Sequence, residues 1–504
     1  MATLSTMLEA RVRETPDAVA VETDDAVLSW GELWDHARRL SSHLHSLGIG
    51  ACDRVALVCG NSAGYLVAWF AIANVGAATV TVNTGLVGDG LRYGLAQSRP
   101  KLVLIEAALH ARMEQDIAPI ADSLSLLVFD GDRDLFAIAG KHEPAPVHAG
   151  SGAEPLTIVY TSGTTGLPKG VVNCHTGYIE SGRLMVEALG ITAPDRIMVV
   201  LPLFHANPQI YAVMSAVLTG CTLLIRPKFS VSRFFDDARA FRATMFTYVG
   251  TILAMLVARV PEGDRNHMMT RCVGGGCAAE AWRKLRADFG IDAYELYGMS
   301  ETAGWVSANS TTAYRYGTCG KVRDDIELAV VDDGDRPVPI GTSGEIVIRP
   351  RQPFRILLGY WDNPAATQEA SRNFWFHTGD VGQLDADGFL SFLGRRKEII
   401  RKGGENISPA ELEGVILDFE PIEDAAVVAV PDPIFGDEIK ACIVVRRPFQ
   451  AEELIRFLEP RVARFMLPRY LQFLDRIPRT ETEKIQRNLL QEDTKNVLDL
   501  LGNA

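Results

Sequence analysis

The segment LTIVYTSGTTGLPKGVV, residues 156–172, decides the fold class of this chain and points to its chemistry. Its first five residues are apolar or β-branched, which predicts a buried strand. Glycines let a backbone approach an anion closely, while hydroxyls and an ammonium group bind phosphate oxygens. The sequence therefore predicts a polyphosphate-binding loop directly after a strand. The loop residues that carry these groups are Thr161, Ser162, Gly163, Thr164, Thr165, Gly166, Lys169 and Gly170.

This loop differs from the Walker A loop of many nucleotide-binding proteins. Lys169 follows a proline and precedes a glycine, so the Gly-Lys-Ser/Thr pattern that opens a helix is missing. The alternative interpretation is a solvated linker of small residues. We favour a phosphate loop because its hydroxyls, glycines and lysine directly follow an apolar strand.

On both sides of the loop, short β-branched runs alternate with longer helical stretches. This alternation predicts βα units with mainly parallel sheets that are covered on both faces. The polar segment 140–155 is expected to be a loop between two subdomains. The predicted strands lie at residues 55–59, 78–82, 102–105, 124–129, 156–160, 197–201, 222–225 and 245–249, with helical stretches such as 65–76 and 231–242.

The pattern changes in the last third of the chain. Residues 326–350 predict a hairpin-rich stretch, with a DDGD turn and a proline-bearing connection between two strands. Past Gly394 the chain becomes a smaller α+β segment. Its first helix has a strong start signal, with Ser408 as N-cap, Pro409 at the first helical position and Glu411 completing a capping box.

Composition limits the class of protein. The chain has 504 residues, a net charge of -13 and 47% hydrophobic residues, which predicts a globular protein of two or more domains. The negative charge disfavours a nucleic-acid-binding surface. Neither an apolar leader nor a run of about 18 apolar residues is found, so we expect a cytoplasmic protein without a membrane span. The eight scattered cysteines predict buried, reduced thiols.

Further motifs follow the phosphate loop in a fixed order. With them the chain resembles the adenylate-forming superfamily of acyl-CoA synthetases, luciferases and peptide-synthetase adenylation domains. It is most similar to the bacterial acid–CoA ligases, including the carnitine/crotonobetaine-CoA ligase type. The motifs are PLFH (202–205), GGGCAAE (274–280), YGMSETAG (297–304), FHTGD (376–380), GRRKEIIRKGGENISPAELE (394–413) and PRTETEKIQR (478–487).

The resemblance implies an α/β fold with two domains. Residues 1–394 would form a large N-terminal adenylation domain of βα subdomains plus a small distorted barrel. Residues 395–504 would form a small, mobile α+β C-terminal lid domain. The implied activity is ATP-dependent conversion of a carboxylic acid to acyl-AMP with release of pyrophosphate, followed by transfer to coenzyme A to give acyl-CoA and AMP.

The resemblance also implies a nucleotide site. The backbone of Gly275 and Gly276 and the ring of Tyr297 would enclose adenine, although a triple glycine also suits a tight turn. Glu301 would hold Mg²⁺ on the ATP phosphates, a task that suits a carboxylate oxygen. Thr302 would donate a hydrogen bond to the α-phosphate.

Three further polar residues receive roles by resemblance. Asp380 would accept hydrogen bonds from both ribose hydroxyls, and Arg395 would support the same ribose. Lys484 would bridge the substrate carboxylate and the α-phosphate, where a fixed ammonium group stabilises the developing negative charge. Glu483 precedes this lysine where many relatives have glycine, and an acidic neighbour favours the charged ammonium. A surface lysine in a charged tail is the alternative.

The small domain is expected to act twice. Lys397 matches the hinge position about which relatives rotate this domain between the two half-reactions. The rotation would bring Gly403 and Gly404 toward the site, where small residues leave a tunnel for pantetheine. An ordinary basic residue at a domain boundary is the alternative for Lys397.

The acyl pocket is also implied by resemblance. The bulk of Trp305 would shorten the pocket and favour a small, polar or aromatic acid, and Asn207 and Thr251 could bind a polar tail. The same motifs suit other acceptors, namely a carrier-protein thiol, an amine, or an amine attacking an activated oxyacid such as nitrite. The oligomeric state stays open between monomer and homodimer. His205 would line the channel where the acid meets the nucleotide, although taken alone this histidine better suits a satisfied core position. The implied pocket residues are His205, Asn207, Tyr248, Val249, Gly250, Thr251, Gly274, Met299, Ser300, Gly304 and Trp305.

Overall fold

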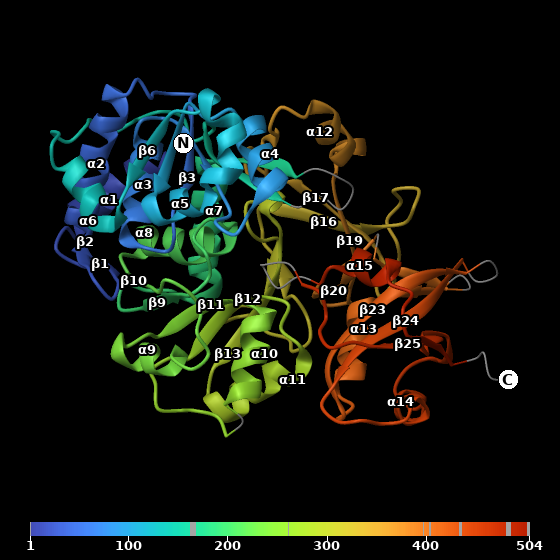
Figure 1. The fold of residues 1–504 in the computed structure, drawn as a ribbon. Coiled ribbons are helices and arrows are strands. Elements are labelled where there is room, and N and C mark those ends of the chain that lie inside the picture. The colour runs from blue at the N-terminus through green and yellow to red at the C-terminus, as the bar shows by residue number, and fades with distance from the viewer. Residues whose placement is uncertain are drawn as a thin grey trace. The chain divides into compact units, whose positions relative to one another are not determined.

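The computed structural model describes residues 2–161, 168–260, 262–396, 398–402, 405–432, 436–479 and 485–500. The chain divides into two compact units (Figure 1), Met1–Glu327 with Arg349–Trp375 and Leu328–Ile348 with Phe376–Ala504. The first unit contains α1 (Leu4–Glu14), α2 (Trp30–Ser46), α3 (Ala63–Asn74), α4 (Gly88–Ser98), α5 (Ala107–Ile117), α6 (Gly131–Ala139), α7 (His175–Leu189), α8 (Ser215–Thr219), α9 (Phe234–Ala240), α10 (Gly250–Arg259), α11 (Ala279–Lys284) and α12 (Pro364–Ala370). The second contains α13 (Pro409–Leu417), α14 (Ala451–Leu458) and α15 (Arg487–Glu492).

Two large sheets form the first unit. Both are mainly parallel, as the βα alternation predicts, with antiparallel strands at the edges. One sheet has the order β18 (Gly359–Tyr360), β8 (Lys169–Cys174), β7 (Pro155–Thr161), β4 (Ala78–Thr81), β3 (Arg54–Val58), β5 (Leu102–Glu106) and β6 (Leu126–Phe129). The other has the order β15 (Lys321–Val322), β14 (Ser307–Ala308), β13 (Asp292–Tyr297), β12 (Arg271–Gly275), β11 (Met245–Val249), β9 (Arg196–Val199), β10 (Thr222–Ile225), β1 (Val19–Glu22) and β2 (Val27–Ser29).

Helix α3 lies in the largest hydrophobic core. All of its residues are buried, because the sequence AGYLVAWFAIAN is apolar around the whole helix. Leu57 of β3 and Ile197 of β9 belong to the same core, so α3 packs in a layer shared by both sheets. The opposite faces are covered by α4 and α5 on one sheet and by α9, α10 and α11 on the other. The predicted helical stretches 65–76 and 231–242 are confirmed as α3 and α9.

The second unit holds two antiparallel-rich sheets. The DDGD turn between β16 and β17 is confirmed. Ser408 caps α13 by accepting a hydrogen bond from the amide of Glu411, which is half of the predicted capping box. The sheets have the orders β16 (Ile326–Val331), β17 (Gly344–Pro350), β19 (Phe376–Leu384), β20 (Leu390–Arg395), and β22 (Glu405–Ile407), β21 (Ile400–Lys402), β24 (Gly436–Val445), β25 (Tyr470–Phe473), β26 (Val497–Asp499), with β23 (Ile422–Asp432) paired to β24.

The compact units do not follow the expected boundary at 394/395. Residues 328–348 and 376–394 group with the C-terminal part of the chain, and their strands β16, β17, β19 and β20 pair with one another in a sheet of their own. Whether the hinge lies at that boundary stays a prediction. All eight cysteines are free thiols, as expected, and six of them are buried. The expectation of burial is wrong for Cys52, which is exposed, and for Cys277, which is half-buried. Among the described residues, no helix combines the length and apolar character needed to cross a bilayer.

Candidate active site

Three neighbouring parallel strands bring two of the predicted motifs to one edge of a sheet. Strands β11, β12 and β13 pair side by side, with Tyr248 opposite Gly274 and Gly274 opposite Glu295. Because the strands are parallel, their carboxyl ends meet at one edge of the sheet. This edge carries the GGG motif, which begins in the last two residues of β12, and the YGMSE motif, which begins at the last residue of β13.

The glycines at this edge are required by close backbone approach. A Cβ atom on Gly250 would lie 1.8 Å from the carbonyl oxygen of Gly276, and one on Gly274 would lie 2.0 Å from the carbonyl oxygen of Tyr248. Gly276 also has a φ of +89°, which side chains other than glycine rarely adopt. The motif is therefore a tight turn with a bare backbone surface, and Gly276 is exposed while Gly275 is half-buried.

Glu295 is a central residue that the sequence reasoning missed. Its side chain is buried and accepts hydrogen bonds from the amides of Gly276 and Cys277 and from the hydroxyl of Tyr248. It thereby ties the glycine turn to an expected acyl-pocket residue. Burial raises the pKa of this carboxyl from 4.5 to about 7, and the hydrogen bonds only partly offset that rise. From the sequence, Glu295 is a single glutamate within a strand and has no feature that predicts a role. Its contact with the glycine turn arises only because β13 lies next to β12.

Replacing Glu295 by glutamine is expected to flatten the pH dependence of stability. The folded carboxyl, with its pKa of about 7, keeps a proton that the unfolded chain loses near pH 4.5. The contribution of this carboxyl to the free energy of unfolding is therefore fully present below pH 4.5 and is lost as the pH rises through 7. The free energy of unfolding should change by up to about 3 kcal/mol for this reason. Denaturant unfolding at pH 5 and pH 8 measures it. Glu280 is an exposed carboxylate, so Glu280→Gln should keep the wild-type dependence of the free energy of unfolding on pH. A wild-type dependence in Glu295→Gln as well would contradict the raised pKa of Glu295.

The predicted phosphate loop joins two antiparallel strands. Thr161 ends β7 and pairs with Lys169, which begins β8. Lys169 therefore opens a strand and not a helix, which confirms that the loop is not of the Walker A type. The Lys169 ammonium lies 5.0 Å from the centre of the Tyr360 ring. The predicted residues Ser162, Gly163, Thr164 and Thr165 lie outside the described residues.

The turn after β13 positions Glu301. Its carboxylate is 5% exposed and accepts a hydrogen bond from the Tyr360 hydroxyl at 3.1 Å. The Asn173 amide on β8 holds the turn through the carbonyl of Ser300 at 3.1 Å. The main chain of Leu357 holds it through the carbonyl of Glu301 at 2.8 Å. Glu301 thus lies between β8 and the segment that ends in Tyr360.

The hydroxyl of Thr302 is engaged within its own turn, and the role expected for it stays a prediction. Its hydroxyl is fully buried, donates to the carbonyl of Met299 at 2.9 Å and accepts from the amide of Met299 at 3.1 Å. The hydroxyl proton is therefore already used inside the turn. Ser300, one residue before Glu301, is half-buried and is the more accessible hydroxyl residue of this turn.

Two of the expected acyl-pocket residues, Asn207 and Thr251, lie at the end of β11. The side-chain amide of Asn207 donates to the carbonyl of Tyr248 at 3.1 Å, and its buried Oδ1 accepts no hydrogen bond from any described residue. His205 is half-buried and its ring packs on Phe204. Thr251 is half-buried on α10. Trp305 is buried, and its indole N–H donates to the carbonyl of Ser181 at 3.1 Å.

The ribose residues expected from the sequence lie in the second unit. Asp380 on β19 pairs directly with Arg395 on β20, and Arg395 Nε lies 2.9 Å from Asp380 Oδ1. Asp380 is buried. The strands thus bring two residues together that are fifteen positions apart in the sequence.

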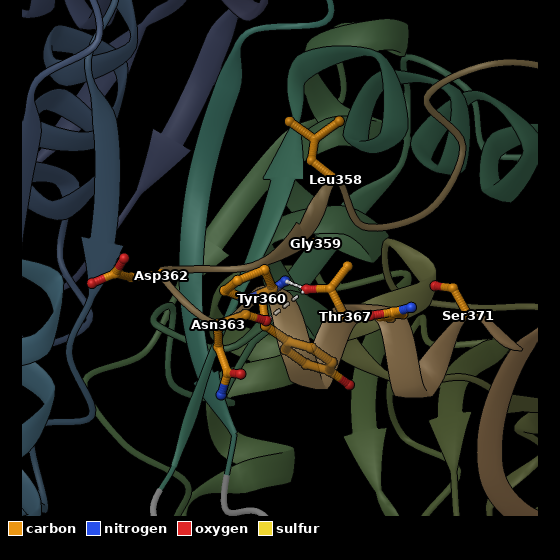
Figure 2. A pocket seen from close by; sticks show the side chains of 9 residues that line it. Leu358, Gly359, Tyr360, Asp362, Asn363, Thr367 and Ser371 are labelled. Carbon is orange, nitrogen blue, oxygen red and sulfur yellow. Dashed lines mark hydrogen bonds between the residues drawn. The ribbon is translucent and has the colours of Figure 1, made fainter.

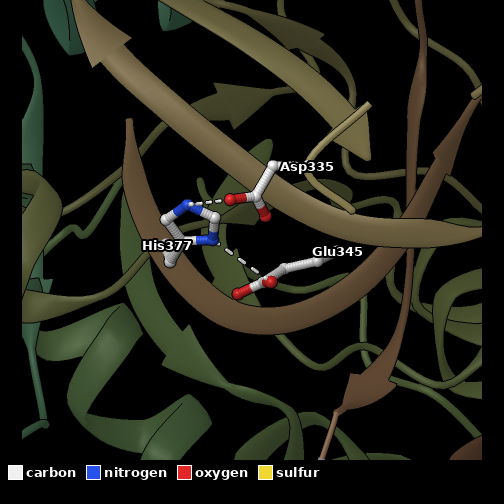
Figure 3. A group of neighbouring side chains, drawn as sticks. All are labelled: Asp335, Glu345 and His377. Atoms are coloured by element: carbon white, nitrogen blue, oxygen red, sulfur yellow. Dashed lines mark ion pairs between the residues drawn. The ribbon is translucent and has the colours of Figure 1, made fainter. Parts of the chain in front are cut away.

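A charged cluster, in which Glu345 and His377 are buried and Asp335 is half-buried, fastens the part of β19 that carries Asp380 (Figure 3). His377 Nδ1 lies 3.2 Å from Glu345 Oε2, and its Nε2 lies 3.8 Å from Asp335 Oδ2. Glu345 also accepts from the amide of Gly379 at 3.2 Å and pairs with Arg396 at 2.6 Å. Since Arg396 supplies a positive charge, the cluster is an ion-pair network that joins the FHTGD and GRRK segments.

Four remaining predicted residues cannot be placed. Lys484, Lys397, Gly403 and Gly404 lie outside the described residues. Their roles stay predictions.

The comparisons with known proteins agree with the motifs and the fold. Residues 8–361 match the AMP-binding enzyme family, and residues 411–484 match the AMP-binding enzyme C-terminal domain. The chain is 31% identical over 481 residues to a feruloyl-CoA synthase from Amycolatopsis sp, covering 94% of this chain and 96% of that one. It is 30% identical over 482 residues to the crotonobetaine/carnitine–CoA ligase of Shigella flexneri, covering 92% and 93%.

A solved structure extends the comparison to the fold. The o-succinylbenzoate CoA synthetase of Bacillus subtilis, in complex with its acyl-adenylate intermediate, matches with a TM-score of 0.88 at 27% identity, over 99% of this chain and 100% of that chain. The chain belongs to the AMP-binding enzyme family. The enzyme class expected from the sequence, an ATP-dependent, AMP-forming acid–CoA ligase, is thereby confirmed.

Proposed function

We propose that this chain activates a small carboxylic acid, whose acyl tail is uncharged and aromatic or hydroxylated, as its acyl-adenylate. The acyl group is then transferred to coenzyme A. In the first step a carboxylate oxygen attacks the α-phosphorus of ATP, the bond to the β-phosphate oxygen breaks, and pyrophosphate leaves. In the second step the thiolate of coenzyme A attacks the acyl carbon, and AMP leaves. The thiol proton passes to solvent.

The nucleotide roles follow from the residues at the strand ends. Lys169 and the loop hydroxyls would hold the phosphates, with Ser300 in place of Thr302 as the donor to the α-phosphate. The bare turn at Gly275 and Gly276 and the ring of Tyr297 would flank adenine. In the second unit, Asp380 and Arg395 would bind the ribose. Lys484 would guide the acid carboxylate onto the α-phosphorus.

Magnesium fits the carboxylate of Glu301. A buried carboxylate that accepts a hydrogen bond from a tyrosine hydroxyl offers a hard, anionic oxygen, which is what Mg²⁺ prefers. The ion would neutralise the phosphates and stabilise the leaving pyrophosphate. Lys397, Gly403 and Gly404 keep the proposed roles of hinge and coenzyme A channel.

The character of the acid follows from the pocket residues. None of the eleven expected pocket residues is an acid, a lysine or an arginine, which disfavours a charged acyl tail. The buried Oδ1 of Asn207 accepts no hydrogen bond from any described residue, and a buried acceptor left unpaired is costly. A hydroxyl or amino group on the substrate would satisfy it. The similarity to a feruloyl-CoA synthase supports an aromatic acid.

The single observation that carries the proposal is the convergence of Lys169, Tyr360 and Glu301 in a chain of the AMP-binding enzyme family. The test offers the purified protein Mg²⁺, ATP and a panel of acids, with and without coenzyme A. Carboxylate-dependent exchange of pyrophosphate into ATP, and acyl-CoA when coenzyme A is present, are expected. Hydroxylated aromatic acids should give a kcat/KM in pyrophosphate exchange about tenfold higher than that of their unsubstituted analogues. Exchange without any acyl-CoA would overturn coenzyme A as acceptor.

A further inference from the structure

Tyr360 occupies a position where three distant segments meet. Strand β18 pairs with β8 so that Tyr360 lies opposite Val171. Directly paired residues point to the same face of a sheet, and so do residues two apart on one strand. Tyr360 and Lys169 therefore share a face, which explains why the ammonium lies 5.0 Å from the ring centre. The hydroxyl of the same ring donates to Glu301 at 3.1 Å.

The backbone around Tyr360 is fixed from α12 (Figure 2). The amide of Tyr360 donates to the Thr367 hydroxyl at 2.9 Å. Asn363 caps α12 by accepting from the amide of Ala366 at 3.0 Å. An open pocket of about 640 Å³ borders the Tyr360 side chain. The ring is half-buried and outside the hydrophobic cores, so its contacts to Lys169 and Glu301 are not a by-product of core packing.

We propose that Tyr360 is a positioning residue for adenylation, which holds the carboxylate of Glu301 and the ammonium of Lys169 in register for the magnesium-bound triphosphate. This inference rests on the proposed function of those two groups. The hydroxyl fixes the orientation of the carboxylate, as hydrogen-bond partners of metal ligands do. The ring face attracts the ammonium and limits the directions it samples.

The test separates the two contacts of one side chain. Tyr360→Phe keeps the ring and removes the hydroxyl, and it should raise the KM for magnesium–ATP in pyrophosphate exchange roughly tenfold. Tyr360→Leu removes the ring as well and should add a further factor of about 2 to 5. The KM for the acid should stay unchanged in both variants, a split that a general loss of structure would not produce.

Trp361→Phe is the matched control. Trp361 follows Tyr360 in the chain, but its indole N–H donates to the carbonyl of Gln97 at 3.3 Å, and Arg54 stacks on its ring at 4.6 Å. It should keep the wild-type KM for magnesium–ATP. If the wild type is active and Tyr360→Phe has the wild-type KM for magnesium–ATP, the role of Tyr360 is overturned while the proposed function stands. A wild type without carboxylate-dependent exchange would instead overturn the proposed function itself.

Discussion

Replacing Lys484 by alanine is expected to lower carboxylate-dependent pyrophosphate exchange by two to three orders of magnitude, roughly the cost of removing a preorganised charge from a transition state. The physical reason is that two anions, the acid carboxylate and the α-phosphate, must approach each other while negative charge builds on phosphorus. An ammonium group at that point offsets the repulsion and fixes the geometry. Water in its place does neither.

The second half-reaction provides the internal control for Lys484→Ala. When preformed acyl-adenylate is supplied, formation of acyl-CoA should stay within a few-fold of wild type, because the thiolate attacks the acyl carbon and not the phosphorus. Lys228→Ala, which removes an exposed lysine on another part of the chain, should leave both half-reactions intact. Equal exchange in Lys484→Ala and wild type would remove this lysine from the mechanism.

Glu301→Gln is expected to reduce pyrophosphate exchange by about two orders of magnitude. Glutamine keeps the shape of the side chain and a hydrogen-bond acceptor for Tyr360, but it lacks the charge that a hard divalent cation requires. Raising the magnesium concentration should recover part of the loss, since the ion is weakened and not excluded. Exchange assayed across a magnesium titration measures both effects.

Combining Glu301→Gln with Tyr360→Phe tests whether both residues act through one ion. If Tyr360 works by orienting the carboxylate, its hydroxyl contributes little once the charge is gone. The double variant should then exchange pyrophosphate at nearly the rate of Glu301→Gln alone. A full additional tenfold loss would mean that Tyr360 acts independently of Glu301.

The local chemistry of this chain was readable from its sequence. Alternating β-branched and helical runs predicted parallel sheets covered on both faces, and each of the eight predicted strands is present. The glycine, hydroxyl and lysine content of residues 160–172 predicted a phosphate loop, and the ordered motifs identified the family. These features depend on neighbouring residues, so short windows of sequence contain them.

Only the tertiary structure decides which of these groups come into contact. Tyr360 meets Lys169 only because β18 pairs with β8 in one particular register, and Glu295 meets the glycine turn only because β12 and β13 are neighbours. In the folded chain, the hydroxyl of Thr302 donates and accepts hydrogen bonds within its own turn. A run of sequence specifies strand character and turn chemistry through local backbone preferences. Strand order and register depend on how distant apolar faces are buried together, and no single segment encodes that packing.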